Sequence, residues 1–238
     1  MMNPQPELIT LALPCYNESG NIENVMRSSA AELEKLGRPW EMLLIDNKSS
    51  DNTPEVIRKH IQGDNRYRLI VHPENLFYSG SCATALREAK GEHIVIMDSD
   101  GQFSASDIPA MTAKLRAGAN LVIGWRRERH DPVSRLLMSK VFNALGRYYL
   151  GFPFHDLNCG IRMFDRRFAA VAEIKHPINM VNPEFYVRAV NAGLKLDEIP
   201  ITHSERNKGQ TSHDLRKFWK LFKQVNNYFA VLGSEIKK

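Results

Sequence analysis

Short apolar runs that alternate with helical patterns are the feature of this chain that most constrains its fold. The runs cover residues 8–13, 40–45, 67–71, 93–97 and 121–123 and are rich in Leu, Ile and Val. Between them, residues 21–36, 53–61, 79–89 and 105–117 are compatible with helices. Continuous apolar runs are typical of parallel strands buried on both faces, and the helices between them form right-handed crossovers. We therefore expect an α/β fold with a mostly parallel, nucleotide-binding sheet flanked by helices, and ligands at the carboxyl ends of its strands.

The pattern changes after residue 125. A charged run at 126–131 precedes a basic amphipathic segment at 133–150, and a stretch rich in Gly, Pro and Cys follows to residue 160. Further along we expect a strand at 161–164, a helix at 183–192, a strand at 194–201 and a terminal helix at about 215–232. The segment 133–150 fits two roles, a helix that lies in a membrane interface and an ordinary helix that covers the sheet.

Composition excludes several classes of protein. The chain has 238 residues, 43% of them hydrophobic, which is enough for a sizeable core. No apolar run reaches the roughly 18 residues of a membrane-spanning helix, and the first residues lack the features of a secretion signal, so we expect a cytoplasmic protein. Three widely spaced cysteines exclude a disulfide framework and a CxxC metal site. The net charge of +5 favours anionic partners, but no nucleic-acid-binding signature is present and we expect no nucleic-acid partner.

Two aspartates follow the apolar run at 93–97. Asp98 and Asp100 are two positions apart, so on a strand they project from the same face. Two carboxylates this close repel each other unless a cation or a proton joins them. A hard divalent cation such as Mg²⁺ or Mn²⁺, completed by substrate phosphates, meets that need. An isolated Asp-x-Asp is often a solvated loop, but the place at the end of a buried strand favours a metal site.

Polar groups also follow the first two runs. Pro14 ends the first strand, Tyr16 offers an aromatic face, and Glu18 can accept a hydrogen bond from a ribose hydroxyl. After the second run, Asp46 can accept from a base N–H and Asp51 can cap the next helix. Each signal is weak alone, since a strand-to-helix turn explains it equally well. Together they place three polar strand ends at one edge of one sheet.

Taken in order, these motifs resemble the inverting family 2 glycosyltransferases of the GT-A fold, and most of all their dolichyl- and polyprenyl-phosphate sugar synthase branch. The resemblance is carried by LPCYNE at 13–18, IDNKSSDNT at 45–53, Asn75, MDSDGQ at 97–102, DLNCGIRMF at 156–164 and the segment 198–212, so it covers roughly residues 8–215. It implies a GT-A domain at 1–215, with a donor half at about 8–125 and an acceptor half at about 126–215. A C-terminal amphipathic helix at 216–238 would follow.

The resemblance also implies roles for individual residues. The nucleoside of a nucleoside diphosphate sugar would be held by Pro14, Tyr16, Glu18 and Asp46. Asp98 would contact the ribose or the metal, and Asp100 with Gln102 would bind Mg²⁺ or Mn²⁺. Arg162 and Arg206 would face phosphates of the sugar donor or of a lipid-phosphate acceptor, because a guanidinium group matches two phosphate oxygens. Stabilisation of the departing diphosphate is expected to supply most of the rate.

The chemistry of the acceptor decides whether the reaction needs a general base. A hydroxyl acceptor needs a carboxylate within hydrogen-bond reach, whereas a phosphate acceptor is already anionic at pH 7. We expect Asp156 to be that base if one is needed. Glu184 is the second candidate, although an acid in the first turn of a helix also simply suits the helix dipole.

Two departures from the family pattern leave the base and the sugar open. Asn47 stands where the family usually has a second acid, and Tyr78 stands where many members carry a small or basic residue. The chain also lacks the spanning helices of many polyprenyl-phosphate transferases. If it acts on a polyprenyl phosphate, we expect a peripheral protein on the cytoplasmic membrane face, a membrane partner protein or a homo-oligomer.

Four other functions compete with this hypothesis. One is a glycosyltransferase that acts on a saccharide hydroxyl in cell-surface polysaccharide synthesis. A sugar nucleotidyltransferase would also use acids and a metal, but it normally opens with a Gly-rich phosphate loop that residues 14–18 do not form. A non-enzymatic protein that binds polyanions or a membrane surface fits the basic charge. An inactive relative is compatible with Asn47 but not with intact Asp98, Asp100 and Arg206.

Overall fold

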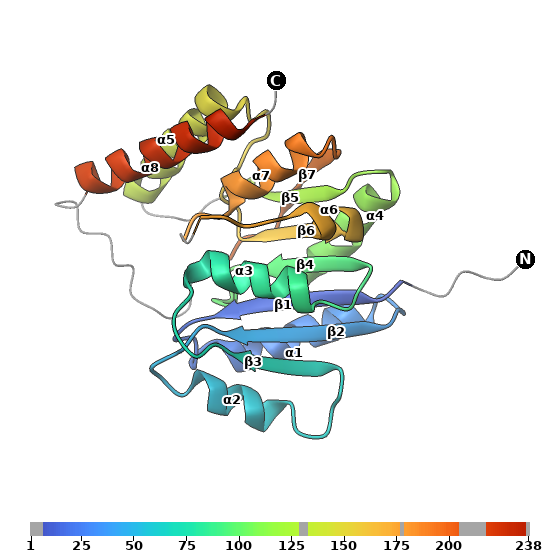
Figure 1. Ribbon diagram of the computed structural model, residues 1–238. Coiled ribbons are helices and arrows are strands. Elements are labelled where there is room, and N and C mark those ends of the chain that lie inside the picture. Colours follow the sequence, from blue (N-terminus) through green and yellow to red (C-terminus); the bar gives the residue numbers. More distant parts are fainter. Residues whose placement is uncertain (1–6, 129–132, 177–178, 205–217, 237–238) are drawn as a thin grey trace, which may run out of the picture.

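The apolar runs form one sheet in the computed structural model, which describes residues 7–128, 133–176, 179–204 and 218–236. Its strands are β1 (Ile9–Cys15), β2 (Trp40–Asp46), β3 (Tyr67–Val71), β4 (His93–Met97), β5 (Leu121–Arg126), β6 (Ile161–Asp165) and β7 (Leu196–Ile201). The sheet has seven strands in the order β3-β2-β1-β4-β6-β5-β7 (Figure 1). The helices are α1 (Ile22–Glu34), α2 (Thr53–His60), α3 (Phe77–Glu88), the 3-10 turn η1 (Ala105–Asp107), α4 (Ile108–Arg116), α5 (Val133–Leu150), α6 (Arg166–Val171), α7 (Asn182–Asn191) and α8 (Phe218–Glu235).

The sheet is mostly parallel, as the apolar runs predict. Strand β1 pairs in parallel with both β2 and β4, β2 with β3, and β5 with β7. Strand β6 runs antiparallel to both of its neighbours, β4 and β5. This insertion sets Arg162 of β6 opposite Ile96 of β4, one strand away from the Asp-Ser-Asp motif. The predicted α/β fold with a mostly parallel sheet flanked by helices is confirmed.

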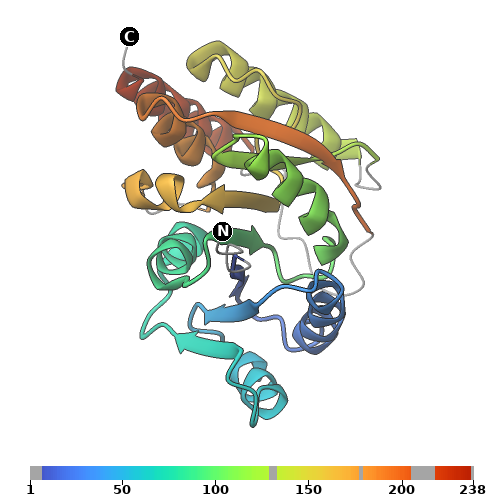
Figure 2. The ribbon, with the colours of Figure 1, turned by 90° about the vertical axis from the view of Figure 1, so that its right-hand side faces the viewer.

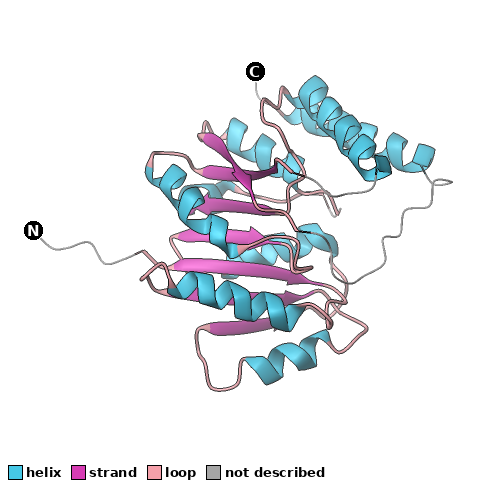
Figure 3. Ribbon diagram, turned by 180° about the vertical axis from the view of Figure 1, so that it is seen from behind, coloured by secondary structure: helices cyan, strands magenta, loops and turns pink. Residues whose placement is uncertain are grey.

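Helices cover both faces of the sheet. Helices α3, α6 and α7 lie on one face, and α1 and α4 lie on the other (Figures 1 and 2). Seen from behind, α1 and α4 stand in front of the strands and α2 lies near the β3 edge (Figure 3). With both faces covered, β1, β2 and β4 are buried along their whole length, which is why their sequences show no polar alternation.

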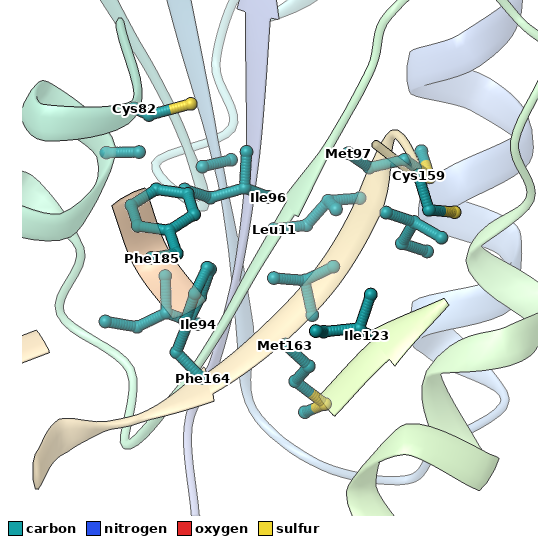
Figure 4. Close-up of a cluster of buried hydrophobic side chains, with 14 of the residues drawn as sticks. Leu11, Cys82, Ile94, Ile96, Met97, Ile123, Cys159, Met163, Phe164 and Phe185 are labelled. Carbon is teal, nitrogen blue, oxygen red and sulfur yellow. The ribbon is translucent and has the colours of Figure 1, made fainter. Parts of the chain in front are cut away.

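The core gathers around β4 and β6. Leu11, Ile94, Ile96, Met163 and Phe164 have no exposed surface, and Figure 4 shows them packed between the helices of the two faces. Burying an aliphatic or aromatic side chain completely is worth about 1.5–3 kcal/mol relative to leaving it exposed. This packing fixes the strand ends, and with them the polar groups that follow each strand.

The structure differs from the sequence predictions in a few elements. Helix α6 was not predicted, because six residues are too few for a helical pattern; its one local signal is Asp165, whose side chain accepts from the Phe168 N–H at 2.9 Å as an N-cap. Strand β5 continues to Arg126, beyond the predicted residue 123, because β7 pairs with it that far. The predicted start of the last helix at 215 lies outside the described residues.

Helices α5 and α8 pack against each other beyond the β7 edge of the sheet (Figure 1). Tyr149 of α5 donates to Asn226 of α8 at 3.1 Å. Helix α8 also packs on α7, so the C-terminal helix is joined to the second half of the sheet's helices. The division into a domain at 1–215 and a helix at 216–238 stays a prediction. None of the helices described is long and apolar enough to span a bilayer.

Candidate active site

A cleft opens at the carboxyl ends of β1 and β4, where the sequence places its polar strand ends. It has a volume of about 270 Å³. Three carboxylates from the first half of the chain line it, those of Glu18, Asp98 and Asp100. Arg162 and the carboxamides of Asn158, Asn179 and Asn182 line it from the second half. A second cavity of about 240 Å³ adjoins it and shares Pro14, Tyr16, Tyr78 and Asn179.

The loops after β1 and β2 are joined by hydrogen bonds between them. Asn17, at φ 58°, accepts from the Ser50 N–H at 2.8 Å, and its own N–H donates to Ser49 Oγ at 2.9 Å. Asp51 accepts from the Ser19 N–H at 3.1 Å. Burial would raise the pKa of Asp51, but its hydrogen bonds from Thr53 and Ser19 lower it below the usual value. These bonds fix the positions of Tyr16, which is half exposed, and of Glu18 at the rim of the cleft.

Asp46 and Asn47 lie deeper, at the end of β2. Asp46 is fully buried; one carboxylate oxygen accepts from the Ser49 N–H at 3.1 Å, and the other has no partner among the described residues. Asn47 donates to Asn75 Oδ1 at 3.0 Å and to the Phe77 carbonyl at 3.1 Å, and it accepts from the Leu76 N–H at 2.9 Å. An aspartate could not donate these two bonds. Asn47 therefore shapes the loop that leads into α3 and lines the second cavity.

Residues 98–100 directly follow β4, and all three line the cleft. The Ser99 side chain turns inward and donates to the Pro14 carbonyl at 2.7 Å, which ties β4 to β1. Asp98 and Asp100 both line the cleft. Burial raises the pKa of Asp98, as does the charge of Asp100, while the charge of Arg162 lowers it. A carboxyl group whose pKa is raised beside a second carboxylate, as at Asp98, indicates a place that a cation would stabilise.

Asp98 belongs to a hydrogen-bonded chain of three side chains, of which Arg162 is buried and the other two are partly buried. Tyr78, at the start of α3, donates to Asp98 Oδ1 at 2.6 Å, and Arg162 Nη2 donates to the Tyr78 hydroxyl at 2.8 Å. Burial raises the pKa of Tyr78 well above its usual value, so the hydroxyl keeps its proton. Arg162 is only 3% exposed, and its Nε and Nη1 atoms have no hydrogen-bond partner among the described residues.

The residues named for the metal fit a divalent cation in part. Asp98 and Asp100 offer carboxylate oxygens to the same cleft, as a hard cation requires. Gln102 is buried and does not line the cleft; its amide donates to the Ser204 carbonyl at 3.4 Å. Within the described ranges, no three His, Cys, Asp or Glu side chains form a group that could hold a metal. A cation here would depend on the two aspartates and on substrate phosphates.

Neither predicted general base reaches the cleft. Asp156 is buried and pairs with Arg126, with distances of 2.7 Å from Nε and 3.1 Å from Nη2. Glu184 has no exposed surface and accepts from Arg188 Nη2 and the Lys175 N–H, both at 2.6 Å. Both carboxylates are therefore engaged in ion pairs or hydrogen bonds that stabilise the fold. The catalytic role of Asp156 stays a prediction that this geometry does not favour. Arg206 lies outside the described residues.

Sequence reasoning missed four side chains of the cleft. Tyr78 was noted only as a departure from the family pattern, yet it contacts Asp98 directly. Asn158 lies in the segment 156–164 that carries the resemblance, but no role was predicted for it. Asn179, whose Oδ1 accepts from the Tyr78 N–H at 3.0 Å, and Asn182 had no signal in the sequence. Carboxamides occur in every kind of loop, so only the folded structure places these three side by side.

Comparison with known proteins identifies the family of the chain. A family model described as "Glycosyl transferase family 2" matches residues 10–171, which is more than half of the chain. Curated relatives named undecaprenyl-phosphate 4-deoxy-4-formamido-L-arabinose transferase, from Salmonella paratyphi A and Salmonella enteritidis, are 28% identical over 210 residues. These matches cover 88% of this chain but only 63% of the relatives, so the chain spans less than two thirds of their length.

Solved structures share the fold. Glucosyl-3-phosphoglycerate synthase from Mycobacterium tuberculosis, in complex with Mn²⁺, UDP and phosphoglyceric acid, superposes with a TM-score of 0.71 at 19% identity and covers 95% of this chain and 78% of that chain. A mannosyltransferase from Pyrobaculum calidifontis, in complex with GDP-Man and Mn²⁺, gives a TM-score of 0.64 at 21% identity and covers 96% and 70%. Because the family model matches more than half of its residues, the chain belongs to glycosyl transferase family 2.

Proposed function

We propose that this protein is a metal-dependent inverting glycosyltransferase that moves a sugar from a nucleoside diphosphate sugar to a polyprenyl phosphate such as undecaprenyl phosphate. The observation that carries the proposal is the cleft in which Asp98 and Asp100 face a buried guanidinium, that of Arg162, with two donor atoms that have no partner among the described residues. The wall formed by the two aspartates thus suits a cation, and the wall formed by Arg162 suits an anion. The names of the curated relatives support the lipid-phosphate acceptor, and the ligands of the structural neighbours support the nucleotide and the metal.

The donor nucleotide fits the first half of the site. Tyr16 can stack on the base and Glu18 can accept from the ribose. Asp46 is fully buried and lines neither cavity among the described residues, so its contact with the base stays a prediction. Asp98 and Asp100 would hold Mg²⁺ or Mn²⁺, which neutralises the charge that develops on the diphosphate as it leaves. These two carboxylates would otherwise repel the diphosphate, so we expect nucleotide binding to require the metal.

Within the part of the chain that the structure describes, the wall of the cleft formed by the second half carries no carboxylate, which supports the phosphate acceptor. Among the described residues of the cleft, the acids are Glu18, Asp98 and Asp100, all from the donor half. An acceptor phosphate oxygen needs no base: it forms the new bond to the anomeric carbon from the face opposite the diphosphate, whose bond breaks with inversion. Arg162 would orient that phosphate through its remaining N–H groups and lower the repulsion between the two phosphate-bearing substrates.

Helix α5 supports peripheral membrane binding. Leu137 is 61% exposed and Tyr148 is 81% exposed, about three helical turns apart and therefore on one face. Lys140 and Arg147 are exposed on the same helix. Apolar side chains flanked by cations are typical of helices that lie on anionic bilayers. Liposome co-sedimentation at low and high salt tests this, and no pelleting at low salt would contradict it.

The decisive experiment offers UDP- and GDP-sugars with Mn²⁺ to the protein together with undecaprenyl phosphate, undecaprenol or a soluble saccharide. We expect mass spectrometry to find a glycosylated lipid phosphate and no product from undecaprenol. Arg162→Gln should lower the rate about a hundredfold or more, whereas Arg58→Gln, an exposed arginine of α2, should leave it unchanged. Transfer to the saccharide alone would refute the lipid acceptor, and no transfer from any nucleotide sugar would refute the activity.

A further inference from the structure

Asp98, which is partly buried, and the buried Arg162 are opposite charges that line the same cleft, yet they form no direct ion pair among the described residues. The Tyr78 hydroxyl stands between them, accepting from Arg162 Nη2 at 2.8 Å and donating to Asp98 Oδ1 at 2.6 Å. Among the ion pairs between described residues, none joins Asp98 to Arg162. The direct pairs Arg126–Asp156 and Arg188–Glu184, at 2.7 and 2.6 Å, show what such charges do elsewhere in this fold.

A hydroxyl group suits this position for a chemical reason. It can accept from a guanidinium and donate to a carboxylate at the same time, whereas a phenyl ring can do neither. Attraction between unit charges in a buried site is strong, so without the hydroxyl the two groups would close on each other. A closed pair would occupy both the carboxylate and the guanidinium.

Tyr78 is itself held firmly on several sides. Its N–H donates to Asn179 Oδ1 at 3.0 Å, and the residue before it, Phe77, has φ 58° and a carbonyl bonded to Asn47. The Arg162 guanidinium lies 5.7 Å from the centre of the tyrosine ring. On the far side, a Cβ on Gly160 would come within 2.2 Å of Asp98 Oδ2, so only glycine leaves room for the carboxylate there. The spacing of the two charges is therefore built by three separate segments of chain.

The geometry points to Tyr78 as a positioning residue that keeps Asp98 and Arg162 apart, so that each remains available to a ligand of opposite charge. Asp98 then serves the metal and nucleotide, and Arg162 keeps Nε and Nη1 for a phosphate. The inference rests on the proposed function for the identity of these ligands. The separation of the charges depends on this chain alone.

The first test is structural and needs no ligand. Tyr78→Phe removes one oxygen and keeps the ring, so the fold should persist. A crystal structure of the variant is expected to show the guanidinium and the carboxylate in direct contact, within about 4 Å. A guanidinium that stays in place, with the carboxylate still apart from it, overturns the proposal. This result is independent of whether the protein binds nucleotides.

The second test is calorimetry with Mn²⁺ and UDP or GDP. Tyr78→Phe should weaken metal-dependent nucleotide binding about tenfold or more, because the Asp98 carboxylate is then held by Arg162. Tyr186→Phe is the matched control: it removes another tyrosine hydroxyl, bonded to the Gly151 carbonyl at 3.3 Å, and should change nothing. Undiminished binding by Tyr78→Phe contradicts the inference. Failure of the unaltered protein to bind either nucleotide contradicts the proposed sugar donor instead, and the crystal structure then decides.

A double mutant separates spacing from simple orientation of Asp98. In an Arg162→Gln background no guanidinium remains to close on Asp98, so adding Tyr78→Phe should cost less than about threefold in nucleotide affinity. An equal loss in both backgrounds would mean that the hydroxyl only orients the carboxylate, and it would overturn the proposal.

Discussion

Gly160→Ala tests the close approach at the centre of the cleft. A Cβ there would lie 2.2 Å from Asp98 Oδ2, 2.4 Å from Phe103 Cε2 and 2.7 Å from Asp98 Cγ, all far inside normal contact distance. Both neighbours are held, Asp98 by Tyr78 and Phe103 by its contact with His203. Overpacking of this kind costs about 1–3 kcal/mol of folding free energy, and for a chain of this size about 2 kcal/mol lowers Tm by roughly 4–8 °C.

The same substitution should damage binding beyond its effect on stability. Moving the Asp98 carboxylate breaks its hydrogen bond from Tyr78, and hydrogen bonds to charged groups are worth about 1.5–3 kcal/mol. We expect metal-dependent nucleotide affinity to fall about tenfold to a hundredfold, measured by calorimetry well below Tm. Gly118→Ala is the control, because its φ of +105° strains the backbone while the space around it is open. Equal affinity losses in both variants, or none in Gly160→Ala, would refute this reasoning.

Further outcomes follow from the same geometry. Asp100→Ala should abolish Mn²⁺-dependent nucleotide binding with Tm nearly unchanged, and undiminished affinity would remove Asp100 from the metal site. Asn47→Asp loses two donated hydrogen bonds and should cost about 1–3 kcal/mol in chemical denaturation; a smaller change would show that the loop before α3 does not need them. Asp156→Asn should lower the free energy of unfolding, because the largely buried Arg126 loses its charge partner, yet the variant should retain most of its turnover with a lipid phosphate. A hundredfold loss of rate in a variant that still folds would show instead that Asp156 acts as a general base. Burial raises the pKa of the Cys159 thiol to about 12, so it should not react with a thiol reagent at pH 8 unless the protein is unfolded, and rapid native reaction would contradict its burial.

The sequence predicts the sheet well because a strand that is buried on both faces appears in the sequence as a continuous apolar run. A strand such as β4 must be apolar at every position, so His93–Met97 and the runs like it stand out against the polar loops. The ends of β2 and β4 are just as legible, since Asp46 and Asp98 each follow an apolar run. The prediction that Pro14 ends the first strand was wrong, because β1 stays paired with β2 as far as Cys15. Parallel strands bring their carboxyl ends to one edge, and the structure brings Pro14, Tyr16, Glu18, Asp98 and Asp100 to one cleft there.

The general base shows where this reasoning stops. Asp156 is chemically suited to the role, and nothing near it in the chain speaks against it. Its partner Arg126 belongs to β5, and the two meet only because β6 returns beside that strand. A carboxylate paired with a guanidinium has the same chemical structure as a free base and differs from it only in its spatial neighbours. A single sequence does not show which residues those neighbours are.

What the sequence by itself determined is therefore the parallel sheet, the family resemblance and the edge of the sheet at which the cleft opens, because each depends on residues that are adjacent in the chain or on periodicity. Only the tertiary structure decided the antiparallel insertion of β6 and the chain of hydrogen bonds from Arg162 through Tyr78 to Asp98. Those three residues come from β6, α3 and the end of β4, and their side chains meet across the sheet. Hydrogen bonds and charge pairing act over a few ångströms in space, so their outcome is set by which strands become neighbours and not by distance along the chain.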